Sequence, residues 1–302
     1  MTMNSRVRPA RLSLLKRCSL TLAAASFALV ASAAAVPDTT PVDLYQDMES
    51  GKIGDLLTPE LLTASCHGEE ATWSVHGDLW LSTDNARALP GPAVVDGKIF
   101  ADREATRTWM FKDSTTRNYV QCDFKDRNIA NITVACFYTP GVTIPFGNQF
   151  DTIALTGLQA FAVLQTRNDD GKGPYLRAHS CTTGWKTTFS PTQIKVESGK
   201  TYWVNLHFDG KEGKAFVAVF DPDKSFAQAG ETAVAQSCPS VMWSLAFGRF
   251  DNHGNNPKAT TQSYFGQILV DYTKGAFPLL PQTASPPGSS SAPQSQNEKA
   301  AP

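Results

Sequence analysis

The feature that most constrains the fold is a series of short segments rich in β-branched and aromatic residues, separated by turn-forming residues. Such segments, with partial alternation of apolar and polar residues, predict β-strands. We expect strands at residues 119–124, 132–138, 152–155, 159–166, 202–208, 215–220, 244–250 and 264–272. Helical patterning is confined to residues 42–49 and 59–64. Many strands with little helix predict an all-β antiparallel sandwich or barrel rather than a nucleotide-binding α/β fold.

The first 35 residues read as a targeting segment. Five basic residues precede an apolar run at residues 19–34, which ends in small residues. This order is typical of a secretory signal peptide that is removed after export. A membrane anchor is the alternative, but the run is shorter than the ~20 residues that span a bilayer. We therefore expect a secreted or periplasmic protein, with no membrane span in the rest of the chain.

The remaining chain divides into a single domain and a tail. Residues 36–280 contain no internal linker and no repeat, which favours one sandwich domain. Residues 281–302 are rich in Pro and Ser with little to bury, so we expect a disordered tail. Residues 1–35 hold five of the 27 basic residues and no acidic one, so the rest carries 22 basic and 28 acidic residues, a net charge of −6. This acidity argues against nucleic acid as a partner.

Five cysteines remain after the targeting segment, and an oxidising compartment permits disulfides. Cys122 and Cys136 flank a polar turn between two expected strands, so a bridge across this hairpin is one prediction. The alternative is that the cysteines are buried, unpaired side chains. The spacing lacks the CxxC pairs that many zinc sites use.

Several segments of the later chain resemble a known superfamily. Residues 198–209 have the glycine, tyrosine and strand pattern seen in concanavalin A-like lectin/glucanase and laminin G-like domains. Residues 215–223, 247–249 and 264–272 continue the pattern, and residues 48–55 resemble the opening strand and turn. The resemblance covers residues 42–280 and implies a jelly roll of two antiparallel sheets, one convex and one concave. It does not fix an activity, because this fold supports binders, hydrolases and lyases.

Two expected strands carry polar and aromatic residues at every second position, which places these residues on one face of each strand. The residues are Tyr175, Arg177 and His179 in one segment and Trp203, Asn205 and His207 in the other. If both segments lie in one sheet, the six side chains line a surface suited to carbohydrate, because aromatic rings stack on sugars and planar polar groups meet hydroxyls. The alternative is the solvent side of a half-buried sheet.

The same residues also permit a catalytic hypothesis. Polysaccharide lyases of this fold abstract a proton beside a uronic carboxylate with Tyr or His and neutralise that carboxylate with Arg or Asn. Tyr175, His179, Arg177, Asn205 and His207 would supply these groups. Glycoside hydrolysis has less support, because the adjacent Glu69 and Glu70 point to opposite sides of an extended chain.

No cofactor is required by any motif, but a structural calcium ion is an open alternative. Asp251 and Asn252 begin an oxygen-rich loop at residues 251–256 and are the candidate metal ligands. An ordinary turn accounts for the same composition, because Asn, Asp and Gly are common turn residues.

Three functions therefore stay open. The leading hypothesis is an exported lectin-like sandwich that binds an extracellular carbohydrate or polymer without catalysis. The second is a polysaccharide lyase that acts on a uronic-acid polymer. The third is a structural or adhesion domain with a protein partner.

Overall fold

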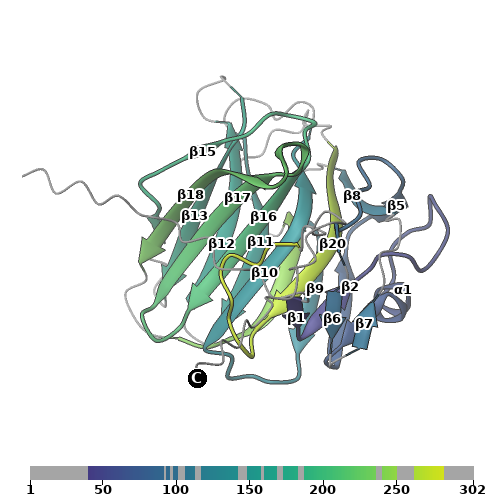
Figure 1. The fold of residues 1–302 in the computed structure, drawn as a ribbon, viewed down its shortest axis with the longest axis horizontal. Helices are drawn as coiled ribbons and strands as arrows, with labels where there is room; N and C mark the ends of the chain where they lie inside the picture. The colour runs from purple at the N-terminus through teal and green to yellow at the C-terminus, as the bar shows by residue number, and fades with distance from the viewer. Residues whose placement is uncertain are drawn as a thin grey trace, which may run out of the picture. The chain divides into compact units, whose positions relative to one another are not determined.

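The computed structural model describes residues 40–281 apart from several internal segments. The described residues are 40–91, 93–95, 98–100, 106–112, 117–141, 148–157, 160–168, 173–182, 187–235, 240–249 and 262–281. The predicted signal peptide and most of the predicted tail lie outside them. Two large sheets dominate this part of the chain, and in both sheets every described pairing is antiparallel (Figure 1). The predicted all-β antiparallel sandwich is confirmed.

We name the first sheet the β10 sheet after its central strand. In spatial order it contains β18 (Ala227–Ala235), β17 (Lys214–Asp221), β16 (Tyr202–Asp209), β10 (Asn131–Thr139), β20 (Gln262–Asp271), β2 (Leu44–Gln46) and β3 (Cys66–Gly68). Two further strands extend it, with β8 (Thr108–Lys112) beside β20 and β5 (Leu79–Ser82) beside β8.

The second sheet, which we name the β12 sheet, faces the first. In spatial order it contains β14 (Thr187–Phe189), β13 (Tyr175–Thr182), β12 (Ala160–Asn168), β11 (Asn148–Gly157), β19 (Met242–Arg249), β9 (Asn118–Phe124) and β4 (Ala71–His76). The short strand β15 (Ile194–Lys195) pairs with the start of β13.

Three smaller elements complete the described secondary structure. A small sheet contains β1 (Thr40–Val42), β6 (Ala93–Val95) and β7 (Lys98–Phe100). The helix α1 (Pro59–Ala64) confirms one predicted helical piece, and the Thr58 side chain caps it by accepting from the Leu61 amide. A 3₁₀ turn, η1 (Pro222–Lys224), follows β17. The prediction of a second helical piece at residues 42–49 is wrong, because this segment contains the strand β2. Most of its residues are buried, and the spacing of apolar residues cannot distinguish a helix from a strand that is buried on both faces.

The main core lies between the two large sheets. Alternating strand residues supply it, such as Val120, Cys122 and Phe124 of β9 and Val204 and Leu206 of β16. This arrangement follows from the period-two pattern of a strand, which sends every second side chain to one face. The apolar alternation of the sequence therefore positions both sheets.

A second apolar cluster covers the opposite face of the β10 sheet. Trp203, Phe137 and Leu269 lie on that face, and Leu89 and Leu279 pack on them from outside the sheet. Leu279 belongs to a segment at the end of the described chain that we name the C-terminal strap (residues 276–281). It follows β20 and passes over β10 and β16, drawn in yellow in Figure 1. Both faces of the β10 sheet are therefore buried at its centre.

The predicted Cys122–Cys136 disulfide is wrong. Cys122 lies on β9 and Cys136 on β10, so the turn between them connects the two sheets rather than closing a hairpin. Both thiols are fully buried in the main core and unpaired, and burial raises the pKa of each thiol. The third described cysteine, Cys66, is also free.

We expect removal of the C-terminal strap to destabilise the fold, whereas removal of the residues after it should not. A chain that ends at Gly275 loses the burial of Leu279 and two hydrogen bonds to its backbone, which together contribute about 4 kcal/mol. A chain that ends at Pro281 keeps all of these contacts. Urea unfolding of the two truncated proteins and the full chain measures the difference. Equal stability of the two truncated proteins would show that the strap contributes nothing.

Candidate functional site

The predicted ligand surface does not form, because its two halves lie in different sheets. Tyr175, Arg177 and His179 lie on β13 of the β12 sheet, whereas Trp203 and its neighbours lie on β16 of the β10 sheet. Between them, Leu176 of β13 and Val204 of β16 point into the shared core. The two polar sets consequently face away from each other, and the prediction of one shared sheet is wrong.

The polar face of β16 is occupied by the chain itself. Trp203 and Asn205 are both fully buried. The Trp203 indole Nε1 donates to the Leu279 carbonyl at 2.8 Å, and the Leu279 amide donates to Asn205 Oδ1 at 2.8 Å. These two side chains bind both polar groups of one strap residue, so they satisfy the buried backbone there. In this structure they position the strap rather than line an open surface.

His207 belongs to the same covered face. Its ring stacks on Phe277 with centroids 5.2 Å apart, and its Nδ1 forms a 2.8 Å hydrogen bond with Thr133 Oγ1. Burial lowers the pKa of His207 below its ordinary value of 6.5, while the charges of Asp209 and Asp271 oppose this effect. Burial has the largest influence, so the structure favours the neutral ring.

The three predicted residues of β13 form a local cluster of their own. Arg177 Nε donates to Gln165 Oε1 at 3.0 Å, and the guanidinium carbon lies 3.7 Å from the centroid of the Phe189 ring. His179 lies 5.5 Å from the same ring. All three of Tyr175, Arg177 and His179 are buried. Of these, Tyr175 also lines a cavity.

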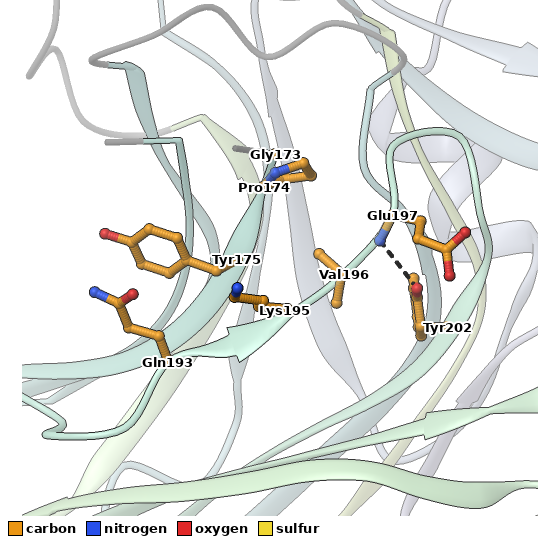
Figure 2. Close-up of a pocket in the computed structure, with 8 residues that line it drawn as sticks. All are labelled: Gly173, Pro174, Tyr175, Gln193, Lys195, Val196, Glu197 and Tyr202. Atoms are coloured by element: carbon orange, nitrogen blue, oxygen red, sulfur yellow. Dashed lines mark hydrogen bonds between the residues drawn. The ribbon is translucent and has the colours of Figure 1, made fainter. Parts of the chain in front are cut away.

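This cavity has a volume of about 310 Å³ and mixes aromatic, apolar and polar side chains. We name it the tyrosine cavity, and its lining consists of Gly173, Pro174, Tyr175, Gln193, Lys195, Val196, Glu197 and Tyr202. Figure 2 shows Tyr175 and Gln193 at one side and Glu197 and Tyr202 at the other, with Pro174 and Val196 between them. The volume is within the range of small-ligand sites.

Backbone pairing builds one wall of the tyrosine cavity. Tyr175 of β13 pairs with Lys195 of β15, so these side chains start from neighbouring strands. One residue further on, the Val196 amide donates to the Pro174 carbonyl at 3.1 Å. Gly173 has a φ of +111°, and a side chain there would meet nothing within 4 Å, so the glycine leaves the cavity edge open. The two strands thus hold the lining in a defined register.

A tight turn builds the other wall. The Lys200 amide donates to the Glu197 carbonyl at 3.3 Å, which closes a four-residue turn. Gly199 occupies its third position with a φ of +75°, the left-handed value that a type II turn requires. The Glu197 amide then donates to the Tyr202 hydroxyl at 3.0 Å, drawn as the dashed line in Figure 2. The turn therefore fixes the positions of both Glu197 and Tyr202.

The charged groups around this turn differ in how they are bound. Lys200 forms a 2.8 Å ion pair with Asp221 and a longer one, 3.7 Å, with Glu197, and the hydrogen bond to Asp221 raises the pKa of Lys200. Tyr202 is buried, and burial raises the pKa of its hydroxyl, which keeps it protonated at neutral pH. Gln193, Lys195 and Glu197 are exposed. These three exposed polar side chains are part of the cavity lining.

Tyr175 is the one residue of this lining that the sequence pattern predicts as a site residue. Alternation places Tyr202 on the face opposite Trp203. Gln193, Lys195 and Glu197 lie in an irregular segment with no alternation to mark them. The one usable signal was the glycine turn before Tyr202, which was recognised as part of the superfamily resemblance but not as a wall of a site.

The predicted calcium ligands Asp251 and Asn252 lie outside the described residues. Within the described ranges, no group of three or more His, Cys, Asp or Glu side chains is arranged to hold a metal ion. The described part of the chain likewise contains no helix with the length and apolar character needed to cross a membrane.

Comparisons with known proteins show a general likeness at low identity. No family model matches the chain, and no curated protein matches it. Among solved structures, the botulinum neurotoxin serotype D binding domain aligns with 76% of this chain at 12% identity and a TM-score of 0.43, over 47% of its own length. The CBM2 module of the Lactobacillus casei BL23 phage J-1 evolved Dit aligns with 77% of this chain at 11% identity and a TM-score of 0.43, over 97% of its own length.

A third solved structure, the cellulose induced protein Cip1, aligns with 76% of this chain at 8% identity and a TM-score of 0.40, over 96% of its own length. At these identities and scores the matches carry no argument about ligand or activity. The chain also spans only about half the length of the toxin domain that it matches.

We expect the stability of the fold to decline as the pH falls below about 6.5, in part because of His207. The pKa of this ring is lower in the folded state than in the unfolded chain. As the pH falls, the unfolded chain therefore takes up the proton before the folded protein does, which stabilises the unfolded state relative to the folded one. The stabilisation is present above the unfolded pKa and is lost as the pH falls. Replacement His207→Gln removes this group, so its free energy of unfolding should decline less between pH 7 and pH 5 than that of the unmodified protein, as measured in urea. Identical declines would contradict the assignment.

Proposed function

We propose that this protein is an exported, lectin-like β-sandwich that binds an extracellular carbohydrate at the tyrosine cavity without catalysis. The observation that carries the proposal is the composition of this cavity. Two tyrosines border it, and an amide, an ammonium group and a carboxylate are exposed in its wall. Both tyrosine rings are buried, so contact with a sugar comes from the exposed polar groups, which exchange hydrogen bonds with its hydroxyls.

The arrangement of the cavity supports binding by a preformed site. The β13–β15 pairing and the Glu197–Lys200 turn hold the backbone of both walls. A rigid wall reduces the entropy that ligand binding costs. The exposed side chains of Gln193 and Lys195 keep some freedom to adapt to a hydroxyl pattern.

Substitution of the exposed lining residues tests the site without disturbing the core. The variants Lys195→Ala and Glu197→Ala should each weaken binding about tenfold, because each loses a hydrogen bond to a charged group. Their matched controls are Lys211→Ala and Glu212→Ala, which are exposed and outside the cavity. A glycan array with the mature protein selects the saccharide, and calorimetry measures its affinity for each variant.

Two results of this experiment would contradict the proposal in different ways. If the array shows no binding to any glycan, carbohydrate binding itself is wrong. If a glycan binds but both lining variants match their controls, binding takes place elsewhere and the cavity is wrongly assigned. Melting temperatures of all four variants should agree with that of the unmodified protein, since every substituted side chain is exposed.

The lyase hypothesis has lost its geometric basis and yields a separate prediction. It required Tyr175, Arg177 and His179 to act with Asn205 and His207 on one substrate, but the two sets lie in different sheets and face opposite ways. Incubation with alginate, glucuronan or pectate should therefore produce no unsaturated ends absorbing in the ultraviolet. An absorbance increase that is lost in His179→Ala would overturn this expectation.

A further inference from the structure

A second cavity also borders the Glu197–Lys200 turn. Its volume is about 260 Å³, and its lining consists of Asp84, Asn85, Thr139, Pro140, Gly199, Gln262 and Tyr264. We name it the Asp84 cavity. Its residues come from four separate parts of the chain, and none of them is among the candidate ligand residues predicted from the sequence.

The Glu197–Lys200 turn contributes a lining residue to each cavity. Glu197 lines the tyrosine cavity and Gly199 lines the Asp84 cavity. These residues are two positions apart, so their Cα atoms are separated by at most about 7 Å. The two linings therefore meet at this turn, and an extended molecule that reached from one cavity to the other would cross it.

Hydrogen bonds hold the crossing point in place. The Gly199 amide donates to the Pro140 carbonyl at 2.8 Å. The hydroxyls of Thr139 and Thr201 are hydrogen-bonded at 2.8 Å, and both residues are buried. The wall shared by the cavities is therefore tied to the end of β10, and the geometry of the crossing is fixed before any ligand arrives.

The Asp84 cavity has the chemistry of a hydroxyl-binding site. The Tyr264 hydroxyl donates toward two acceptors, Gln262 Oε1 at 3.0 Å and Asp84 Oδ2 at 3.4 Å. Burial raises the pKa of Tyr264, as does the charge of Asp84, so this hydroxyl remains a donor. The Asp84 and Gln262 side chains are exposed and have acceptor capacity beyond this one donor.

We propose that the tyrosine cavity and the Asp84 cavity are neighbouring subsites for one extended, neutral oligosaccharide that crosses the Glu197–Lys200 turn. This inference rests on the proposed function and specifies its ligand. The preference for a neutral chain follows from charge. Glu197 and Asp84 place a carboxylate in each cavity, and Lys200 at the turn lies 2.8 Å from Asp221 and 3.7 Å from Glu197. Lys195 and Lys200 compensate Glu197, whereas the described lining of the Asp84 cavity holds no cation, so a uronic-acid chain would meet a like charge at Asp84.

Ladders of defined saccharides test the inference by calorimetry. The probes are cello-, manno-, xylo- and malto-oligosaccharides of one to six units, with oligogalacturonates of the same lengths as the anionic series. In the neutral series that binds, affinity should rise with length as the second cavity fills. The measured quantity is the ratio of the affinity for the hexasaccharide to the affinity for the monosaccharide. Asp84→Ala should reduce this ratio about tenfold, and Tyr264→Phe should reduce it several-fold. Asp78→Ala, an exposed acidic residue outside both linings, is the control.

Each outcome separates the inference from the proposed function. An unchanged ratio in both cavity variants would overturn the second subsite while leaving binding at the tyrosine cavity intact. Tighter binding of the anionic series than of any neutral series would overturn the neutral preference. Absence of binding to every ladder, together with a negative glycan array, would remove the proposed function and this inference with it.

Discussion

The burial of β16 on both faces closes the centre of the β10 sheet. Every side chain from Tyr202 to Phe208 is buried. One face packs into the core between the sheets, and the other lies under the C-terminal strap. The side chains of Trp203 and Asn205 form hydrogen bonds with the carbonyl and the amide of Leu279, so the strap is held through its backbone. The centre of the β10 sheet is thereby closed, and the described cavities lie beside the ends of strands.

The strands themselves could be predicted from the sequence, because their signal is local. The expected segments 202–208 and 215–220 correspond to β16 and β17 within one residue at each end. The strap could not be predicted in the same way. Its contacts with β16 join residues 74 and 76 positions apart, and no periodic pattern marks residues 276–281. Alternation shows which side chains share a face, but it carries no information on what covers that face.

The candidate site illustrates the same limit for function. Tyr175 was found because it alternates with Arg177 and His179, and the structure does place it at a cavity. The other residues that line this cavity come from an irregular segment and a turn. Neither has the alternating pattern that identifies the faces of a strand. Gly199 was the most informative residue there. A glycine in the left-handed region marks a tight turn, and tight turns between strands are common positions for binding residues.

The charge of the chain connects these observations with the class of ligand. Beyond the first 35 residues the net charge is −6, and the two described linings together hold two carboxylates and one lysine, with the uncompensated carboxylate in the Asp84 cavity. An anionic polymer would have to overcome both the long-range repulsion of the protein and the local repulsion at the Asp84 cavity. A neutral sugar chain meets neither, and its hydroxyls can donate to the same carboxylates that would repel an acid. The feature that disfavours uronic-acid polymers is therefore the feature that supplies acceptors for neutral ones.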